Sequence, residues 1–510
     1  MAYLIVVKNL KEHCKAYNGE SLTIKGVFNL RLSRLLEVLS IPLHESLDCD
    51  IQHIVFHSKQ IQKGDLFVAV PGLSTDGHAY IDDAIMAGAS AVIGEQAMAI
   101  LSVPYFTVPN ARLALAKLSA ELYGHPYRKH TMIGITGTNG KTTTSQMIRH
   151  ILEYALQSCS LFGTVERYMN GKSFPSAMTT YDAVQLQQWL HQSRDNHVIM
   201  EVSSHGLEQH RVDGMMFDFA LFTNLSHEHL DYHHTLDHYF IAKQRLFYLL
   251  KDGGEAIVNT NCHWGRQLVD KLHHEEILVC TFGRSKGDTL ELLSVENNLQ
   301  TVFHVRENGN IHTLKLLLPG MYNVWNAMAA VLLARRMTIP FSVITEALVS
   351  FPGVPGRLEN YRHPNGALFV IDYAHTPDGL LQCLEAMNVY KPRRLVHIFG
   401  FRGNRDESKW EVMMEVSKRY CDETILTLDD LNTVLSDHIL EWYERLQGTT
   451  TKVIADRTLA LAYAWEQASL GDCIVVTGKG PEAYQSSFEL DARSDSETIL
   501  LLQERSMNLV

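Results

Sequence analysis

Residues 134–144 read Gly-Ile-Thr-Gly-Thr-Asn-Gly-Lys-Thr-Thr-Thr, and this stretch decides the fold. The run Thr-Met-Ile-Gly-Ile-Thr (131–136) has the composition of a short strand, and the apolar residues Met147, Ile148, Ile151 and Leu152 recur at helical spacing. The loop therefore joins a strand to a helix N-terminus. Its glycines let backbone N–H groups turn toward an anion, and the helix dipole favours negative charge there. We predict a phosphate-binding loop.

The loop also carries the side chains that a bound nucleotide needs. Lys141 can reach the outer phosphates, and the hydroxyl of Thr142 is placed for a magnesium ion. The spacing differs from the standard Gly-x-x-x-x-Gly-Lys-Thr, because Ile135 stands at the first glycine position. An ordinary strand-to-helix turn is the alternative, and Gly-Lys-Thr between both flanking elements argues against it. The candidate nucleotide contacts are Gly137, Thr138, Asn139, Gly140, Lys141, Thr142 and Thr143.

Bulk composition excludes several classes of protein. A chain of 510 residues with 46% hydrophobic content predicts about three globular domains. The net charge of -12 and the lack of basic blocks argue against nucleic acid as a partner. No apolar run is long enough to span a membrane, and residues 1–7 meet Lys8 too soon for a secretory signal. We expect a cytoplasmic protein without membrane insertion, whose eight scattered cysteines stay reduced.

The order of motifs predicts an α/β protein of three domains. Residues 1–127 form a small N-terminal α/β domain, with strands near Gly64–Gly72 and Ala91–Gly94 and a helix between them. Residues 128–350 form a central P-loop ATPase-like domain. In residues 351–510 a strand, a polar loop and a helix recur, which is typical of a doubly wound, Rossmann-like domain.

Acidic and histidine residues gather at the ends of the predicted central strands. The strand at 196–204 carries Glu201, and the strand at 219–224 runs into Ser-His-Glu-His-Leu-Asp-Tyr-His (226–233). Ligands bind at this edge of a parallel sheet, so Glu201 is a candidate magnesium ligand beside Thr142. A capping or salt-bridged glutamate is the alternative. His229 and Asp231 are candidates for a second metal, whereas the pair His233–His234 is typical of a surface loop.

Two asparagines stand near the start of the helix predicted at 323–336. Asn323 and Asn326 lie at i and i+3, so they share one helix face. Asparagine has a poor helix propensity, and a pair at this position indicates capping or contact with a ligand.

Together these motifs resemble the Mur ligases of peptidoglycan synthesis, and within them the branch of UDP-N-acetylmuramoyl-tripeptide synthetases. The resemblance covers nearly the whole chain. It rests on Gly-Thr-Asn-Gly-Lys-Thr-Thr-Thr (137–144), Glu-Val-Ser-Ser-His-Gly-Leu (201–207), Phe-Thr-Asn-Leu-Ser (222–226), His-Leu-Asp-Tyr-His (229–233), Gly-Val-Pro-Gly-Arg (353–357) and Asp-Tyr-Ala-His-Thr-Pro-Asp (372–378).

The resemblance implies an ATP-dependent amide ligase. In the family, ATP phosphorylates a substrate carboxylate, the amine of an amino acid attacks the acyl phosphate, and phosphate leaves. The implied catalytic residues are Lys141, Glu201, His229 and Lys243, and the implied magnesium ligands are Thr142, Glu201, His229 and a carbamylated Lys243. By its residue type and spacing alone, Lys243 would be interpreted as a solvated helix charge.

The resemblance also implies the substrate contacts. Further nucleotide contacts are Asn323, Asn326, Arg357, Asp372 and His375. Contacts to the UDP-sugar-peptide are Ser58, Thr179, Thr180, Ser203 and Arg211. Around the incoming amino acid, Arg405 receives the carboxylate and Glu482 lies near the distal amine, with Asn432 and Gly478 beside them.

Several positions depart from the family pattern. His57-Ser58-Lys59 replaces Asp-Ser-Arg at the uridine site, Thr179-Thr180-Tyr181 replaces Thr-Thr-Pro, and Glu228 and Pro481 replace an aspartate and a histidine. Members that add diaminopimelate carry Asp-Asn-Pro-Arg, whose arginine pairs with the distal carboxylate, whereas residues 429–433 here read Asp-Asp-Leu-Asn-Thr. A threonine cannot replace a bidentate guanidinium. We predict that diaminopimelate is not the preferred amino acid.

Three functions remain open from the sequence. The first is a monomeric cell-wall ligase that uses ATP and magnesium to add lysine or a neutral amino acid to UDP-MurNAc-L-Ala-D-Glu. The second is a paralogue that makes amides on a different acidic acceptor, which the change at 57–59 favours. The third is a nucleotide-binding regulator without catalysis. The retained catalytic residues argue against it: Lys141, Glu201, His229 and Lys243. We favour the first because the motifs cover the chain.

Overall fold

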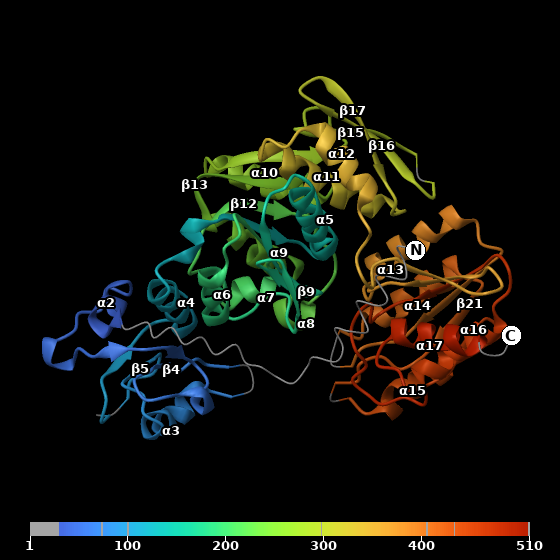
Figure 1. Cartoon of the computed structure of the whole chain (residues 1–510). Helices are drawn as coiled ribbons and strands as arrows, with labels where there is room; N and C mark the ends of the chain where they lie inside the picture. The colour runs from blue at the N-terminus through green and yellow to red at the C-terminus, as the bar shows by residue number, and fades with distance from the viewer. Residues whose placement is uncertain are drawn as a thin grey trace. The chain divides into compact units, whose positions relative to one another are not determined.

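The computed structural model describes most of the chain, which divides into two compact units, Met1–Tyr123 and Gly124–Val510 (Figure 1). The described residues are 30–72, 75–98, 101–296, 298–403, 406–432 and 434–507. Within these ranges no helix is long and apolar enough to cross a membrane.

The first unit contains a four-stranded parallel sheet in the order β3-β4-β5-β6. Its elements are β1 (Leu30–Arg31), α2 (Leu32–Glu37), η1 (Glu45–Leu47), β2 (Asp50–Ile51), β3 (Ile54–Val55), η2 (Ser58–Gln60), β4 (Leu66–Val68), η3 (Gly77–Tyr80), α3 (Ile81–Met86), β5 (Ala91–Gly94), β6 (Tyr105–Thr107) and α4 (Ala111–Leu122). Every residue of β4 and β5 is buried, as expected for a parallel sheet covered on both faces. The predicted succession of strand, helix and strand is confirmed.

The second unit begins with an eleven-stranded sheet in the order β10-β9-β8-β11-β7-β12-β13-β14-β15-β16-β17. The strands from β8 to β15 in this order are parallel, and antiparallel strands extend both ends. The strands are β7 (Thr131–Thr136), β8 (Cys159–Phe162), β9 (Glu166–Met169), β10 (Lys172–Pro175), β11 (His197–Glu201), β12 (Phe217–Phe222), β13 (Leu250–Asn259), β14 (Leu278–Gly283), β15 (Leu290–Glu296), β16 (Thr301–Glu307) and β17 (Asn310–Leu316). Because β7 lies between β11 and β12, the phosphate loop leaves the middle of the parallel part.

Helices cover both faces of this sheet (Figure 1). They are η4 (Pro126–Lys129), α5 (Lys141–Tyr154), α6 (Ala183–Gln192), α7 (Ser204–Glu208), α8 (Leu230–His233), α9 (Leu236–Gln244), η5 (Arg245–Leu249), α10 (His263–His274), α11 (Met321–Arg336) and α12 (Phe341–Ser350). Successive residues of β7 point to opposite faces: Ile133 and Ile135 pack with α5, α11 and α12, while Met132 packs with α6, α9 and α10. The four apolar residues that predicted α5 are all buried in the first of these cores.

A second sheet follows in the order β18-β19-β23-β20-β21-β22, parallel except for β18. Its elements are β18 (Glu359–Arg362), β19 (Leu368–Ile371), α13 (Pro377–Met387), η6 (Asn388–Tyr390), β20 (Arg394–Phe399), α14 (Lys409–Tyr420), β21 (Glu423–Leu426), α15 (Ser436–Leu446), β22 (Thr451–Val453), α16 (Arg457–Gln467), β23 (Asp472–Val476) and α17 (Asp495–Met507). Helices α13, α14 and α15 contribute to one core, and α16 and α17 to the other. The predicted α/β fold class, with its central ATPase-like and Rossmann-like parts, is confirmed.

A buried ion pair fastens α16 and α17 to the end of β23. The guanidinium of Arg457 donates to both carboxylate oxygens of Asp495, at 2.7 and 2.8 Å, and both side chains are fully buried. The same Nη2 of Arg457 donates to the carbonyl of Thr477 at 2.8 Å. Since Thr477 is followed by Gly478, this pair holds the start of a loop that carries predicted substrate contacts.

We predict that Asp495→Ala destabilises the C-terminal part by about 3–5 kcal/mol, because it leaves a buried guanidinium without its counter-ion. Urea unfolding followed by tryptophan fluorescence measures the loss. The matched control is Glu407→Ala, which removes a carboxylate 3.4 Å from His438 with both side chains more than half exposed. The control should cost under about 1 kcal/mol, and equal losses for the two variants would contradict the prediction.

Candidate active site

The phosphate loop adopts a backbone that only glycine tolerates at two positions. Gly137 has φ +151° and Gly140 has φ +88°. A Cβ atom on Gly137 would lie 1.9 Å from Thr223 Oγ1, and one on Gly140 would lie 2.2 Å from Asn326 Oδ1. Between them, the N–H of Asn139 donates to Asn224 Oδ1 at 2.9 Å. The loop is therefore packed tightly against the end of β12 and the start of α11.

Two lysines converge on one carbonyl of this loop. Lys141 Nζ donates to the carbonyl oxygens of Gly137 and Thr138 at 2.8 and 2.9 Å. Lys243 Nζ, from α9, donates to the same Gly137 oxygen at 2.9 Å. The side chain of Lys243 is 1% exposed, and its ammonium also lies 4.4 Å from the centre of the Tyr239 ring. The interpretation of Lys243 as a solvated helix charge is wrong, because α9 turns this residue inward beneath the loop.

The charge of both lysines is disfavoured in this position. Burial lowers the pKa of Lys243 well below its usual value, the charge of Lys141 lowers it further, and Glu228 opposes the shift. Burial also lowers the pKa of Lys141, with Glu201 opposing and Arg357 adding to the shift. A bound anion would relieve this repulsion, and the lowered pKa of Lys243 favours its neutral amine, which is the nucleophilic form.

Thr142 and Glu201 form a pair of oxygen donors beside the loop. Thr142 Oγ1 donates to Glu201 Oε2 at 2.9 Å, and Thr164 Oγ1 donates to the same oxygen at 2.8 Å. Glu201 is 1% exposed and ends β11, as expected from the sequence. Carboxylate and hydroxyl oxygens are the ligands that magnesium takes beside nucleotide phosphates, so the pair fits this ion. Across the described ranges, no cluster of three or more histidine, cysteine, aspartate or glutamate residues could hold a metal by itself.

His229 lies in a cluster of aromatic rings near the loop. It precedes α8 with φ +56°, and its ring centre lies 4.8 Å from that of His205 and 6.0 Å from that of Tyr239. The ring of His233 stacks on Tyr239, and its Nε2 is hydrogen-bonded to Ser204 Oγ at 2.9 Å. His233 is 3% exposed. The expectation that His233 lies in a surface loop is wrong. Burial, reinforced by the neighbouring His205, lowers the pKa of His233 to about 4.

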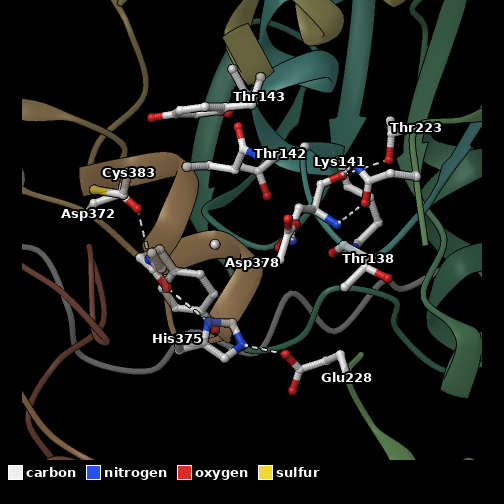
Figure 2. Close-up of a pocket in the computed structure, with 18 of the residues that line it drawn as sticks. Thr138, Lys141, Thr142, Thr143, Thr223, Glu228, Asp372, His375, Asp378 and Cys383 are labelled. Atoms are coloured by element: carbon white, nitrogen blue, oxygen red, sulfur yellow. Dashed lines mark hydrogen bonds and ion pairs between the residues drawn. The ribbon is translucent and has the colours of Figure 1, made fainter. Parts of the chain in front are cut away.

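A cavity of about 460 Å³ extends from the loop to the C-terminal sheet within the second unit (Figure 2). All five further nucleotide contacts implied by the resemblance line it: Asn323, Asn326, Arg357, Asp372 and His375. Asp372, at the end of β19, accepts from the backbone N–H groups of Leu358 and Ala374 at 2.9 and 2.8 Å. The cavity thus joins a phosphate site to side chains from the other sheet.

His375 and Glu228 lie side by side in the lining of this cavity (Figure 2). His375 Nδ1 donates to the carbonyl of Tyr373 at 2.9 Å, and His375 Nε2 lies 3.7 Å from Glu228 Oε2. Burial lowers the pKa of His375 well below its usual value, and the charges of Arg402 and Lys409 add to the shift. Lys409 Nζ donates to the other oxygen of Glu228 at 3.3 Å. A neutral imidazole therefore lies beside a carboxyl group that also accepts from Lys409.

The predicted contacts to the UDP-sugar-peptide gather beside Glu201. Thr180 Oγ1 donates to the Glu201 carbonyl at 2.9 Å and to Ser203 Oγ at 3.1 Å. Arg211 Nη1 donates to the carbonyl of Thr180, and Thr179 Oγ1 lies 3.0 Å from Thr164 Oγ1. Ser58 belongs to the first unit, where it begins η2.

The predicted contacts to the amino acid gather at the ends of β20, β21 and β23. Glu482 accepts from Tyr373 and Arg402, Gly478 accepts from Arg402 through its carbonyl, and Asn432 Nδ2 donates to Gly403 at 2.7 Å. Arg405 lies outside the described residues.

Sequence reasoning missed several residues that the fold brings to the cavity. Lys409, Asp378 and Arg402 line it, and Asp378 Oδ2 accepts from Asn139 Nδ2 at 3.3 Å. Asp378 ends one of the motifs quoted for the resemblance, and Arg402 follows a predicted strand, so their positions carried a signal. Nothing in the local pattern marked Lys409, because its partner Glu228 is distant in sequence.

Comparison with known proteins agrees with this geometry. Three domain families match the chain: the Mur ligase family catalytic domain over residues 50–123, the Mur ligase middle domain over 135–334, and the Mur ligase glutamate ligase domain over 356–480.

Two curated relatives carry the name UDP-N-acetylmuramoyl-L-alanyl-D-glutamate–2,6-diaminopimelate ligase. The protein of Alkaliphilus oremlandii is 35% identical over 447 residues, which cover 86% of this chain and 91% of the relative. That of Bacillus velezensis is 35% identical over 471 residues, which cover 89% and 95%.

Two solved structures share the fold. A structure of a ligase with the same name has a TM-score of 0.67 and 26% identity, covering 94% of this chain and all of that one. The MurF ligase of Thermotoga maritima in complex with ADP has a TM-score of 0.62 and 20% identity, covering 92% and 100%.

We predict that Gly140→Ala weakens ATP binding at least about tenfold, or ~1.4 kcal/mol, because the new methyl group meets Asn326 in a backbone region unfavourable for alanine. Titration calorimetry with ATP measures the change. Gly171→Ala is the matched control, since Gly171 has φ +76° but no atom within 4 Å of the added Cβ. The same loss of affinity in both variants would show that steric fit at the loop is not the cause.

Proposed function

The chain belongs to the Mur ligase family and is an ATP-dependent ligase, and on this premise we propose that it adds an amino acid other than diaminopimelate to UDP-MurNAc-L-Ala-D-Glu. The observation that carries the proposal is the shared cavity, which is lined by Lys141 on one side and by Arg357, Asp372 and Arg402 on the other. A ligase of this kind must bring phosphates, a carboxylate and an amine within reach of one another.

In the proposed reaction, the γ-phosphoryl group of ATP passes to the acceptor carboxylate. The amine then attacks the acyl phosphate, the C–O bond breaks, and phosphate leaves. Phosphoryl transfer depends mostly on positioning and on neutralising charge. The backbone N–H groups of 137–143, Lys141 and Arg357 serve both needs. Magnesium, held by Thr142 and Glu201, would add positive charge at the phosphate oxygens.

Lys243 is proposed to act as a carbamate. Burial lowers its pKa, which favours the neutral amine, the form that reacts with carbon dioxide. Modification would place an anion beside Lys141, and the two side chains would then attract each other. The carbamate oxygens, with His229, would suit a second magnesium ion, whereas the unmodified ammonium cannot be a ligand.

The acceptor is proposed to lie along the cluster beside Glu201. Thr179, Thr180, Ser203 and Arg211 would contact the UDP-sugar-peptide. Within the first unit, Ser58 is proposed as a contact to uridine. In this scheme residues 1–127 bind the UDP-sugar, residues 128–350 bind ATP, and residues 351–510 bind the amino acid through Arg405, Asn432, Gly478 and Glu482.

Residues 429–433, which we call the selector loop, support an amino acid other than diaminopimelate. Asp430 accepts from Lys479, and Asn432 is bonded to Gly403, so these side chains are engaged within the protein. Residues 429–433 contain no arginine, and the short polar residues present cannot pair with a distal carboxylate as a guanidinium does. The curated relatives are named for diaminopimelate, so on this point the chain is proposed to differ from them.

A second candidate function is amide formation on a different acidic acceptor. His57-Ser58-Lys59, which begins η2, favours it because the family carries Asp-Ser-Arg at the uridine contact. A non-catalytic regulator is disfavoured by the inward Lys243, since nucleotide binding alone would not need a second buried lysine beneath the loop.

Phosphate release should require ATP, magnesium, UDP-MurNAc-L-Ala-D-Glu and one amino acid from a panel, and diaminopimelate should not give the highest kcat/KM. A coupled phosphate assay on the purified chain measures this, and omission of each component is the control. Preference for diaminopimelate would contradict the selector-loop argument. No turnover with this acceptor, from protein that binds ATP, would favour the second candidate.

Lys243→Ala should lower phosphate release about a hundredfold or more, the size expected when charge stabilisation is removed from a transition state. ¹³C NMR of protein equilibrated with ¹³C-bicarbonate should show a carbamate signal that this variant lacks. Lys271→Ala, a lysine that is hydrogen-bonded to Gln244 next to Lys243, is the control and should keep both the signal and the activity. A carbamate signal that survives in Lys243→Ala would place the modification elsewhere.

A further inference from the structure

The part of the site proposed to receive the amino acid side chain already contains a cation of the protein, Arg402. This residue follows β20, and its side chain is 13% exposed. Its Nη2 group donates to Glu482 Oε2 at 2.6 Å and to the carbonyl of Gly478 at 2.8 Å. Both acceptors belong to the proposed amino-acid contacts. Arg402 is therefore already hydrogen-bonded to the Glu482 carboxylate and the Gly478 carbonyl, the two acceptors that a distal amine of the substrate would use.

The other oxygen of Glu482 is occupied as well. Tyr373 donates its hydroxyl to Glu482 Oε1 at 2.7 Å. The guanidinium of Arg402 lies 5.3 Å from the centre of the Tyr373 ring, and that of Arg357 lies 4.2 Å from it. Tyr373 thus fixes Glu482 from one side while its ring lies against two cations. Both carboxylate oxygens of Glu482 therefore accept hydrogen bonds from side chains of the protein.

The remaining carboxylates of this region are also engaged or inaccessible. Asp430 accepts from Lys479 Nζ, and the Lys479 side chain is 1% exposed. Asp429 is fully buried, and its Oδ1 lies 3.7 Å from Arg402 Nε and 3.8 Å from Lys479 Nζ. Arg402 and Lys479 are therefore each within 4 Å of two carboxylates, and both lie near Asp429. Among the described residues of this region, both cations are paired with carboxylates, and Asp429 is a buried carboxylate that a substrate cannot reach.

We infer that Arg402 takes the place of a substrate cation and that the enzyme selects an amino acid with a small, uncharged side chain. The inference rests on the proposed function and specifies its amino-acid substrate. A lysine or diaminopimelate side chain would have to separate Arg402 from Glu482, which takes from a largely buried guanidinium the carboxylate to which it donates at 2.6 Å. An acidic side chain that approached Arg402 would meet the carboxylates of Glu482 and Asp429. A neutral side chain disturbs neither pairing.

The test compares kcat/KM for alanine, serine, lysine, glutamate and diaminopimelate in the phosphate-release assay, with ATP and UDP-MurNAc-L-Ala-D-Glu held constant. The wild-type chain should prefer alanine or serine over each charged amino acid by at least about tenfold. Arg402→Ala should shift the lysine-to-alanine ratio toward lysine by about tenfold or more, because Glu482 and the Gly478 carbonyl are released.

Two further variants separate specificity from structural damage. Arg402→Lys keeps a cation next to Glu482 and should keep the wild-type ranking. Arg402→Ala combined with Glu482→Gln should lose the gain toward lysine, which a merely structural role of Arg402 does not explain. Where Arg402→Ala fails to fold, as judged by circular dichroism, Arg402→Gln replaces it in both comparisons.

The outcomes separate the two proposals. A wild-type enzyme that turns over but prefers lysine or glutamate overturns the role of Arg402 and leaves the proposed function intact. A preference for diaminopimelate overturns both the role of Arg402 and the proposed choice of amino acid. An unchanged lysine-to-alanine ratio in the folded Arg402 variant also overturns the role of Arg402. ATP-binding protein that turns over with no amino acid on this acceptor contradicts the proposed function itself.

Discussion

The carbonyl of Gly137 receives the ammonium groups of both Lys141 and Lys243, and much of the site depends on this contact. Two like charges within hydrogen-bonding distance of one oxygen repel each other, and burial adds to the cost. The loop can hold them because Gly137 and Gly140 adopt backbone angles that bring carbonyls inward and pack against Thr223 and Asn326. Negative charge from bound phosphates would therefore stabilise this arrangement of the two lysines.

At the other end of the site, around Glu482, the cations of the protein already have carboxylate partners. Around Glu482 the cations Arg402 and Lys479 are each paired with carboxylates of the protein. At one end of the site two buried lysines share one carbonyl, an arrangement that a bound anion would relieve, and at the other end the described cations are paired with carboxylates of the protein. This difference in electrostatics separates a site for a polyanion from one suited to an uncharged side chain.

The fold brings these two ends together by ordinary packing. The alternation of β7 places its residues in two separate cores, and the helices that form those cores fix α5 and α11 on one side of the phosphate loop and α9 on the other. The pair Arg457–Asp495 fixes the end of β23, from which Gly478 and Glu482 follow. Side chains from two sheets consequently line one cavity within the second unit.

The sequence by itself determined the local elements: the strand and helix on either side of the phosphate loop, the burial of Met147, Ile148, Ile151 and Leu152, and the placement of Glu201 at a strand end. These follow from periodicity and from glycine stereochemistry, which act over a few residues. Only the tertiary structure decided that Lys243 and His233 are buried. It also decided that Glu228 contacts Lys409 and His375, and that Arg402 donates a hydrogen bond to Glu482. Those outcomes depend on burial and on partners far apart in the chain, so no local pattern encodes them.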